Sequence, residues 1–219
     1  LIMTHSDDDG LVLPPALAPS QIVILPVLRK DPAENEAVLA ACETLAKDLR
    51  ARRWRDERLR VQVDNRDLRG GEKTWQHVKK GVPLRVEIGP RDLAENKVFL
   101  ARRDRPSNEK ESVDRDAFVE GVAELLGEMQ DGLYQRALAF REAATVRLES
   151  KEAFEAFFAD GQPGGFAWCF AADDPSYEPY LKELKVTARN TPLHDNEERG
   201  TCIFTGRPDQ RRTVFARAY

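Results

Sequence analysis

The sequence predicts an α/β fold for most of this 219-residue chain. Strand-like apolar runs alternate with segments of helical period, and the connectors between them are short. The strand-like runs lie at residues 21–27, 59–63, 84–88 and 98–101. This alternation is typical of a sheet with helices on both faces, so we expect a mixed α/β domain over residues 19–130. A smaller α+β domain is expected over residues 131–219, and residues 1–18 lead into the first domain.

The composition favours a globular protein. Charged residues make up 33% of the chain, and the net charge of −4 is unlike that of a generally basic nucleic-acid binder. Any RNA contact must therefore rest on a local patch. No apolar run approaches the roughly 20 residues of a membrane span. We see no secretory signal, and the three scattered cysteines make no disulfide framework, so the expected location is cytoplasmic.

The first residues suggest a piece of a longer protein. Residues 1–3 have strand character without an initiator Met at position 1, so we expect them to end a preceding domain. Residues 5–9 form a polar, acidic turn. Pro14, Pro15 and Pro19 then predict an extended linker.

Two helices are expected between the first strands. Asp31 as N-cap and Pro32 at the first helical position predict a helix that runs to about residue 53. Cys42 lies on its apolar stripe, where a buried and inert thiol is expected. A shorter helix is expected over residues 72–80.

The strand at residues 84–88 is the most informative element. By the period of two, Arg85 and Glu87 share one face and the apolar residues share the other. Pro90 cannot continue the ladder, so the chain should leave the sheet there and hold Arg91 close to Glu87. Such a pair suits edge recognition of a base, while the alternative is an ordinary strand with a surface ion pair.

A dense basic cluster is expected around the next strand. Its members are Arg91, Lys97, Arg102, Arg103, Arg105 and Lys110. Further on, helical spacing runs from residue 116 to about residue 149, with a break expected near Gly132. The last domain is expected to contain helices at residues 151–159 and 177–184, strands at residues 165–170 and 185–188, and a closing hairpin of residues 202–204 with residues 214–216.

Three stretches carry a family resemblance. They are HSDDDGLVLPP at residues 5–15, GVPLRVEIGPRD at residues 81–92 and GTCIFTGRP at residues 200–208. Together they resemble the anticodon-binding region of class IIa aminoacyl-tRNA synthetases. The sequence is most similar to prolyl-tRNA synthetases of the archaeal and eukaryotic type, over essentially the whole chain. The resemblance implies an anticodon-binding domain with a mixed sheet flanked by helices, preceded by the tail of a catalytic domain.

The resemblance also implies where the chemistry lies. The parent enzyme would be a proline–tRNA ligase that uses ATP and Mg, with its catalytic residues upstream of this chain. His5, Asp7, Asp8 and the terminal Tyr219 would lie near the active site of the parent. We therefore expect this chain alone to be inactive, and the resemblance implies a homodimeric parent.

The same resemblance implies contacts with the anticodon of the tRNA for proline. Glu87 would accept from base N–H groups, and Arg91 would donate to base acceptors. Lys97, Arg102, Arg103 and Lys110 would hold the anticodon loop, chiefly through its phosphates. A non-catalytic accessory module that binds a protein partner is the alternative reading.

Related synthetases often bind zinc through four cysteines in the last domain. Cys169 and Cys202 stand at the first position of each implied pair, but Asp174 and Thr205 stand where their partners would be. Two thiols and an Asp make a poor tetrahedral set, so we expect no zinc.

Overall fold

The computed structural model describes residues 1–106, 108–194 and 197–217. It divides into two compact units, Leu1–Ala137 (unit 1) and Leu138–Tyr219 (unit 2). The division falls inside the long helix α5 (Arg115–Ala143), which also contains the predicted boundary after residue 130. No helix in the described ranges is long and apolar enough to cross a membrane.

Unit 1 is built on a five-stranded sheet with the order β4-β1-β5-β6-β7. β1 runs parallel to β4 and β5, and β6 runs antiparallel to β5 and β7. The strands are β1 (Ile22–Pro26), β4 (Val61–Val63), β5 (Leu84–Ile88), β6 (Lys97–Arg102) and β7 (Lys110–Asp114). A small ribbon of β2 (Arg53–Trp54) and β3 (Glu57–Arg58) precedes β4. The predicted mixed sheet is confirmed.

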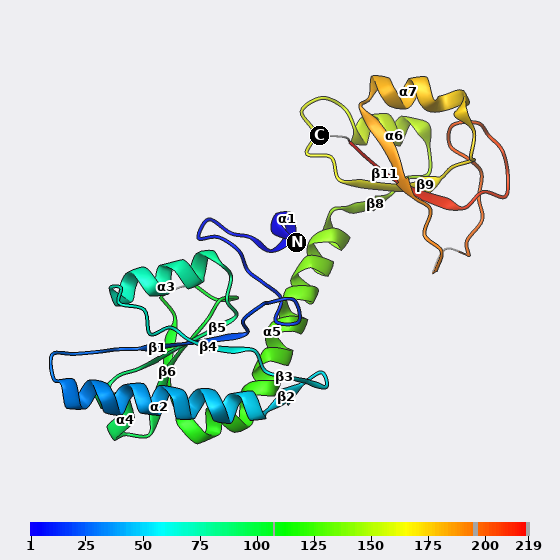
Figure 1. The fold of residues 1–219 in the computed structure, drawn as a ribbon. Helices are drawn as coiled ribbons and strands as arrows, with labels where there is room; N and C mark the ends of the chain where they lie inside the picture. The colour runs from blue at the N-terminus through cyan, green and yellow to red at the C-terminus, as the bar shows by residue number, and fades with distance from the viewer. Residues whose placement is uncertain (107, 195–196, 218–219) are drawn as a thin grey trace. The chain divides into compact units, whose positions relative to one another are not determined.

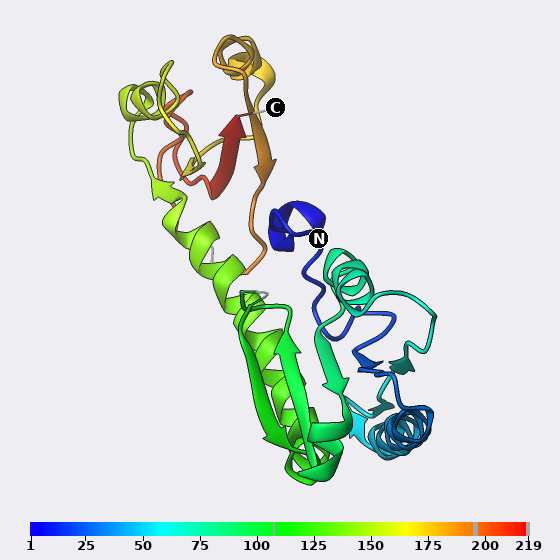
Figure 2. The same cartoon turned by 90° about the vertical axis from the view of Figure 1, so that its left-hand side faces the viewer.

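Helices cover both faces of this sheet, as predicted (Figure 1). α2 (Pro32–Ala51) and α5 pack against the face that carries Ile22, Leu84 and Leu100, and together they form the main core. Figure 2 shows α5 running along β6 and β7. α3 (Gly70–Lys79) lies over the other face, and the short α4 (Pro90–Ala94) follows β5.

The start of α2 follows the predicted capping. The Asp31 side chain accepts a hydrogen bond from the Ala33 amide at 2.9 Å, and Pro32 occupies the first helical position. Cys42 lies in the main core, where burial raises the pKa of its thiol to about 12.

The predicted strand at residues 1–3 is wrong. The structure has a one-turn helix there, α1 (Ile2–His5), in which the amides of His5 and Ser6 donate to the carbonyls of Leu1 and Ile2. Within the described residues no strand pairs with this segment, so local hydrogen bonds satisfy its backbone.

Two further expectations for the chain around α5 are wrong. The helix continues through Gly132 without the expected break, and it ends at Ala143 rather than near residue 149. β7 was not predicted, because its sequence is polar and lacks apolar alternation.

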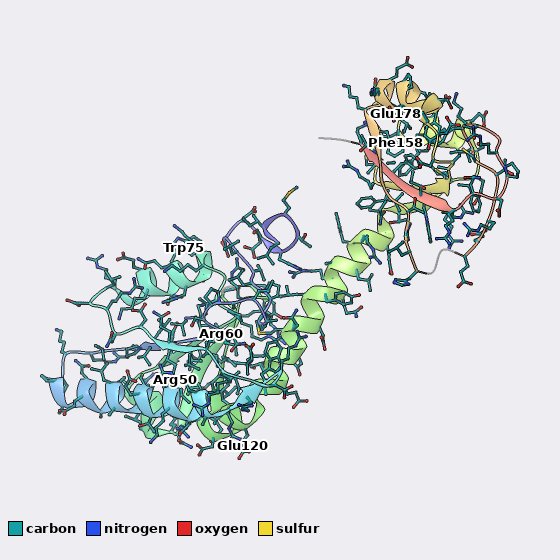
Figure 3. The ribbon with its side chains drawn as sticks, turned by 45° about the vertical axis from the view of Figure 1, so that its right-hand side comes forward. Arg50, Arg60, Trp75, Glu120, Phe158 and Glu178 are labelled. Atoms are coloured by element: carbon teal, nitrogen blue, oxygen red, sulfur yellow. The ribbon has the colours of Figure 1, made fainter. Side chains whose placement is uncertain are left out.

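Unit 2 is a four-stranded sheet with the order β10-β11-β9-β8 and two helices. The strands are β8 (Thr145–Arg147), β9 (Phe166–Phe170), β10 (Val186–Asn190) and β11 (Arg212–Arg217). α6 (Lys151–Phe157) and α7 (Glu178–Glu183) lie on one side of the sheet, with a short 3-10 turn η1 (Pro175–Tyr177) before α7. Phe158, labelled in Figure 3, belongs to an aromatic core between helices and sheet.

The predicted closing hairpin in unit 2 is wrong. β11 pairs with β9 and β10, whereas residues 203–205 form a turn. A bridge between Gly200 and Gln210 closes that turn, and the Cys202 amide donates to the Arg207 carbonyl at 2.8 Å. Turn hydrogen bonds therefore take up the backbone groups that a hairpin would have paired.

Candidate nucleic-acid interface

The carboxyl ends of three parallel strands meet at one edge of unit 1. The chain after β1, the loop after β4 and the end of β5 converge there, next to α3. Open α/β sheets bind ligands at such edges, because the loops that follow neighbouring strands diverge and leave a hollow. The structure has a hollow of about 890 Å³ at this place, lined by residues of all these segments.

Glu87 and Lys110 form an ion pair that lines this hollow. Lys110 Nζ donates to Glu87 Oε1 at 2.7 Å, and the ammonium lies 5.5 Å from the centroid of the Phe99 ring. Glu87 Oε2 has no hydrogen-bond partner within the described residues. The lysine thus fixes the carboxylate while one oxygen stays available to accept from a ligand.

The predicted pairing of Glu87 with Arg91 does not form. The Asp92 side chain caps the start of α4, because the Gly89 amide donates to Asp92 Oδ2 at 2.9 Å, so the chain turns into α4 directly after β5. Arg91 is exposed on that helix, and the ion pairs among the described residues include none between it and Glu87. Arg91 remains close enough to Glu95 to help lower the pKa of that carboxyl, behind the larger effect of Lys97.

Arg85 shares the face of Glu87, as the alternation predicted, but its side chain is buried. It is 1% exposed, and its three guanidinium nitrogens have no hydrogen-bond partner in the part of the chain that the structure describes. Burial and the charge of Arg103 lower the pKa of Arg85, while Glu87 acts in the opposite direction. Arg85 therefore supplies a buried positive charge next to the Glu87 carboxylate.

Asp64 holds the loop that forms one wall of the hollow. Its buried carboxylate accepts two bonds from Arg66, at 2.8 and 2.6 Å, and lies 2.8 Å from His77 Nε2. These bonds, first those from Arg66, lower the pKa of Asp64 strongly, whereas burial lowers the pKa of His77. The buried Lys73 donates to the Asp64 carbonyl at 3.3 Å. The loop is therefore tied to α3.

An aromatic ring and two arginines complete the walls. Trp75 on α3, labelled in Figure 3, is 42% exposed, and Lys79 Nζ lies 5.4 Å from the centroid of its ring. Arg66 and Arg69 line the hollow from the loop after β4. These three side chains are not among the site residues expected from the sequence. The sequence feature that could have indicated them is the run of turn residues after a predicted parallel strand.

The expected basic cluster is largely neutralised inside unit 1. Arg102 is 8% exposed and donates to Asp104, at 3.0 and 2.9 Å, and to Glu128 at 3.2 Å. The Asp104 bonds, followed by those of Glu128, outweigh burial and raise the pKa of Arg102. Lys97 stays exposed but pairs with Glu95 at 2.7 Å. The six cations therefore do not form one free patch.

Arg103 clamps the first residues of the chain. It is 4% exposed, and it donates to both carboxylate oxygens of Asp7, at 2.7 and 2.5 Å, and to the Val78 carbonyl at 3.1 Å. Asp7 was expected near the active site of a parent enzyme, and Arg103 on the RNA surface. The structure joins the two, and the pair lowers the pKa of Asp7.

Gly10 permits a further close approach in the same region. Its φ is +131°, and a Cβ there would lie 2.7 Å from the Lys79 Cα atom.

The structure describes two of the three other residues expected near the active site of the parent. His5 ends α1, Asp8 is exposed in the turn after it, and Tyr219 lies outside the described residues.

The last domain holds two buried cysteines but no fitting metal set. Burial raises the pKa of Cys169 to about 12. Burial also acts to raise the pKa of Cys202, but hydrogen bonds from Thr205, Ala172 and Phe204 lower it overall. Asp174 pairs with Arg207 at 2.8 Å. In the described ranges no group of three or more His, Cys, Asp or Glu side chains could hold an ion, so zinc does not fit these residues.

Comparisons with known proteins match most of unit 1 to a known family model. Residues 21–125 match the family model described as the anticodon binding domain. The chain is 47% identical over its whole length to the proline–tRNA ligase of Rhodopirellula baltica, of which it covers 43%. It is 46% identical to that of Bdellovibrio bacteriovorus, of which it covers 44%, and to proline–tRNA ligase 2 of Anaeromyxobacter dehalogenans, of which it covers 45%.

The chain thus spans less than half the length of these relatives. All three come from bacteria, so they give no support to the archaeal and eukaryotic subtype expected from the sequence.

Proposed function

We propose that this chain is the RNA-binding part of a proline–tRNA ligase, and that unit 1 reads the anticodon of the tRNA for proline. The observation that carries the proposal is the hollow at the strand ends. A fixed carboxylate, an aromatic ring and arginines meet there, within the segment that matches the anticodon binding domain. Unstacked bases are recognised by this combination of edge acceptors and stacking surfaces.

The chemistry of the site fits guanine, which the proline anticodon contains twice. Glu87 Oε2 accepts from the N1 and N2 hydrogens of a guanine, while Lys110 holds the other carboxylate oxygen. Trp75 offers a stacking face at the wall of the hollow. We place the phosphate contacts on the exposed cations Arg66, Arg69, Arg91 and Lys97, and we assign Arg102 and Arg103 a positioning role because both are buried in ion pairs.

The parent enzyme would ligate proline to its tRNA with ATP and Mg, in a catalytic domain outside this chain. His5, Asp7, Asp8 and Tyr219 would border that active site. The finer assignment to the archaeal and eukaryotic subtype rests on the motif at residues 81–92 alone. A homodimeric, cytoplasmic parent belongs to the same proposal.

The test is binding of the chain to a proline tRNA transcript and to one with both anticodon guanines replaced, across a salt series. We expect the intact anticodon to bind at least about tenfold more tightly, because each good base contact is worth about 1–3 kcal/mol. Glu87→Gln should remove this preference. Glu120→Gln, an exposed change on α5 (Figure 3), should leave it intact.

Equal and steeply salt-dependent binding of both transcripts would mean phosphate contact only, and would contradict anticodon reading. Absence of binding would instead favour the accessory module that binds a protein partner.

A further inference from the structure

The sheet of unit 2 has two chemically different faces. Ala167, Cys169 and Phe215 point to the side of α6 and α7, where they join the aromatic core. By the period of two, Phe166 and Trp168 of β9 point to the opposite side, and both are half-buried. In Figure 1 both helices lie on the same side of this sheet. The described part of unit 2 therefore leaves one sheet face without a helical cover.

That open face contains a hollow of about 650 Å³. Its walls combine aromatic and apolar side chains with guanidinium groups, chiefly Phe166, Trp168, Val214, Arg141, Arg147 and Arg189. The strand register explains why they meet. Val214 of β11 and Arg147 of β8 are the two cross-strand neighbours of Trp168.

A β-bulge places Arg189 in this group. The register between β10 and β11 shifts between Ala188 and Asn190, so Arg189 is the extra residue. Bulges re-aim side chains in this way. Arg189 Nη2 donates to the Arg217 carbonyl at 2.8 Å, and the side chain remains exposed.

The arginines of this face keep most of their charge available. Arg147 lies 4.7 Å from the centroid of the Trp168 ring, and its nearest carboxylate, that of Glu198, is 3.8 Å away. Arg141 is 4.0 Å from Glu142. In both pairs the N–O distance is long and the side chains are more than half exposed, and solvent screens such ion pairs strongly.

Two observations indicate what covers this face. The indole Nε1 of Trp168 is buried and has no hydrogen-bond partner in the described residues, so it lacks an acceptor. The charges of unit 2 are also divided between its sides. α6 and α7 carry Glu152, Glu155, Glu178 and Glu183 against two lysines, while three arginines and one carboxylate, that of Glu142, line the hollow on the open face. The occupant should be anionic, aromatic and rich in acceptors.

We propose that this face is a second RNA-binding surface, which takes single-stranded RNA. Bases would stack on Phe166 and Trp168, and Arg141, Arg147 and Arg189 would hold the phosphates. Aromatic side chains on an open sheet, framed by cations, bind single strands in this manner. The inference rests on unit 2 alone and does not depend on the anticodon proposal.

The test is binding of the full chain to a labelled single-stranded RNA of about eight nucleotides that lacks the proline anticodon. We expect Arg147→Gln and Arg189→Gln each to weaken binding roughly fivefold, and to reduce the slope of affinity against salt by about one. Lys182→Gln removes the same charge from α7 and should leave binding unchanged. Equal affinity of all these variants would overturn the proposal.

Ultraviolet crosslinking of the same complex locates the surface independently. Crosslinks are expected in the peptide that contains Phe166 and Trp168. Trp168→Phe should keep most of the binding, whereas Trp168→Ala should lose roughly tenfold. Crosslinks confined to residues 1–137 would overturn the proposal, and so would a lack of binding to any RNA, which would indicate a protein cover for this face.

Discussion

Asp64 is the residue on which the wall of the hollow in unit 1 depends. Its carboxylate has four hydrogen-bond contacts with Arg66 and His77, and its side chain has no exposed surface. Removal of one partner from such a network leaves the others buried without a bond. The same bonds keep the pKa of Asp64 below its ordinary value. Its contribution to stability is therefore complete above about pH 4 and decreases as the pH falls further.

We expect Asp64→Asn to lower the free energy of unfolding by about 1–3 kcal/mol at neutral pH. The loss relative to the unchanged protein should shrink as the pH drops below about 4, because protonation removes the same charge there. Urea unfolding at several pH values measures this. Asp67→Asn, an exposed change in the same loop, is the control, and an equal effect of both changes would contradict the role of Asp64.

At the scale of single residues, the sequence could reveal which side chains share a face of a strand, but not which side chains form pairs. Alternation along the strand placed Arg85 with Glu87 correctly. It could not show that Arg85 is buried, nor that Lys110 rather than Arg91 binds Glu87, because Lys110 arrives from a strand two positions away in the sheet. The bond between Asp7 and Arg103 joins residues 96 positions apart, beyond the reach of any local pattern.

At the scale of elements, α5 shows how packing overrides local propensity. Its glycines suggested a break, since glycine costs about 1 kcal/mol relative to alanine inside a helix. However, Val122, Leu126, Met129 and Leu133 continue the apolar stripe across that region, and all four are buried. Contacts along this stripe outweigh the weak positions. The predicted strands with clear alternation formed, whereas the polar β7 and the three-residue β8 gave no such signal.

We expect Gly132→Ala to raise the free energy of unfolding by about 0.5–1 kcal/mol. Gly132 is exposed, and a Cβ there would meet no atom within 4 Å. Gly10→Ala should do the opposite and cost more than about 1 kcal/mol, because its φ is unfavourable and Lys79 blocks the Cβ. Chemical denaturation of both variants measures the two effects. A loss of stability in Gly132→Ala would show that α5 is strained at that position.

At the scale of the whole molecule, each unit has a core of its own. The cluster that joins α2, α5 and the five-stranded sheet shares no residue with the aromatic cluster of unit 2. Phe158 is fully buried in the second cluster, with its ring centroid 4.9 Å from those of Phe154 and Phe157. Damage to one core should therefore leave the other core in place.

We expect Phe158→Ala to destabilise unit 2 by about 3–5 kcal/mol, as for other large aromatic truncations in cores. Hydrogen exchange followed by mass spectrometry should show faster exchange in residues 145–217 and unchanged protection of β1 and β5. Phe140→Ala removes an aromatic ring that is 76% exposed, and it should change stability by less than about 0.5 kcal/mol. Equally faster exchange in both units would refute separate cores.

In unit 1, the residues that line the hollow are largely different from those that form the main core. Much of its wall comes from the chain after β1, the loop after Asp64 and the α3 side chains that face it, whereas the main core lies on the other face of the sheet. Under the proposed function, exchange of residues 27, 28, 65 or 67–69 would alter the preferred base without removing a side chain from that core or a partner of Asp64. Evolution, or a library confined to those six positions, can thus retune specificity at little cost in stability.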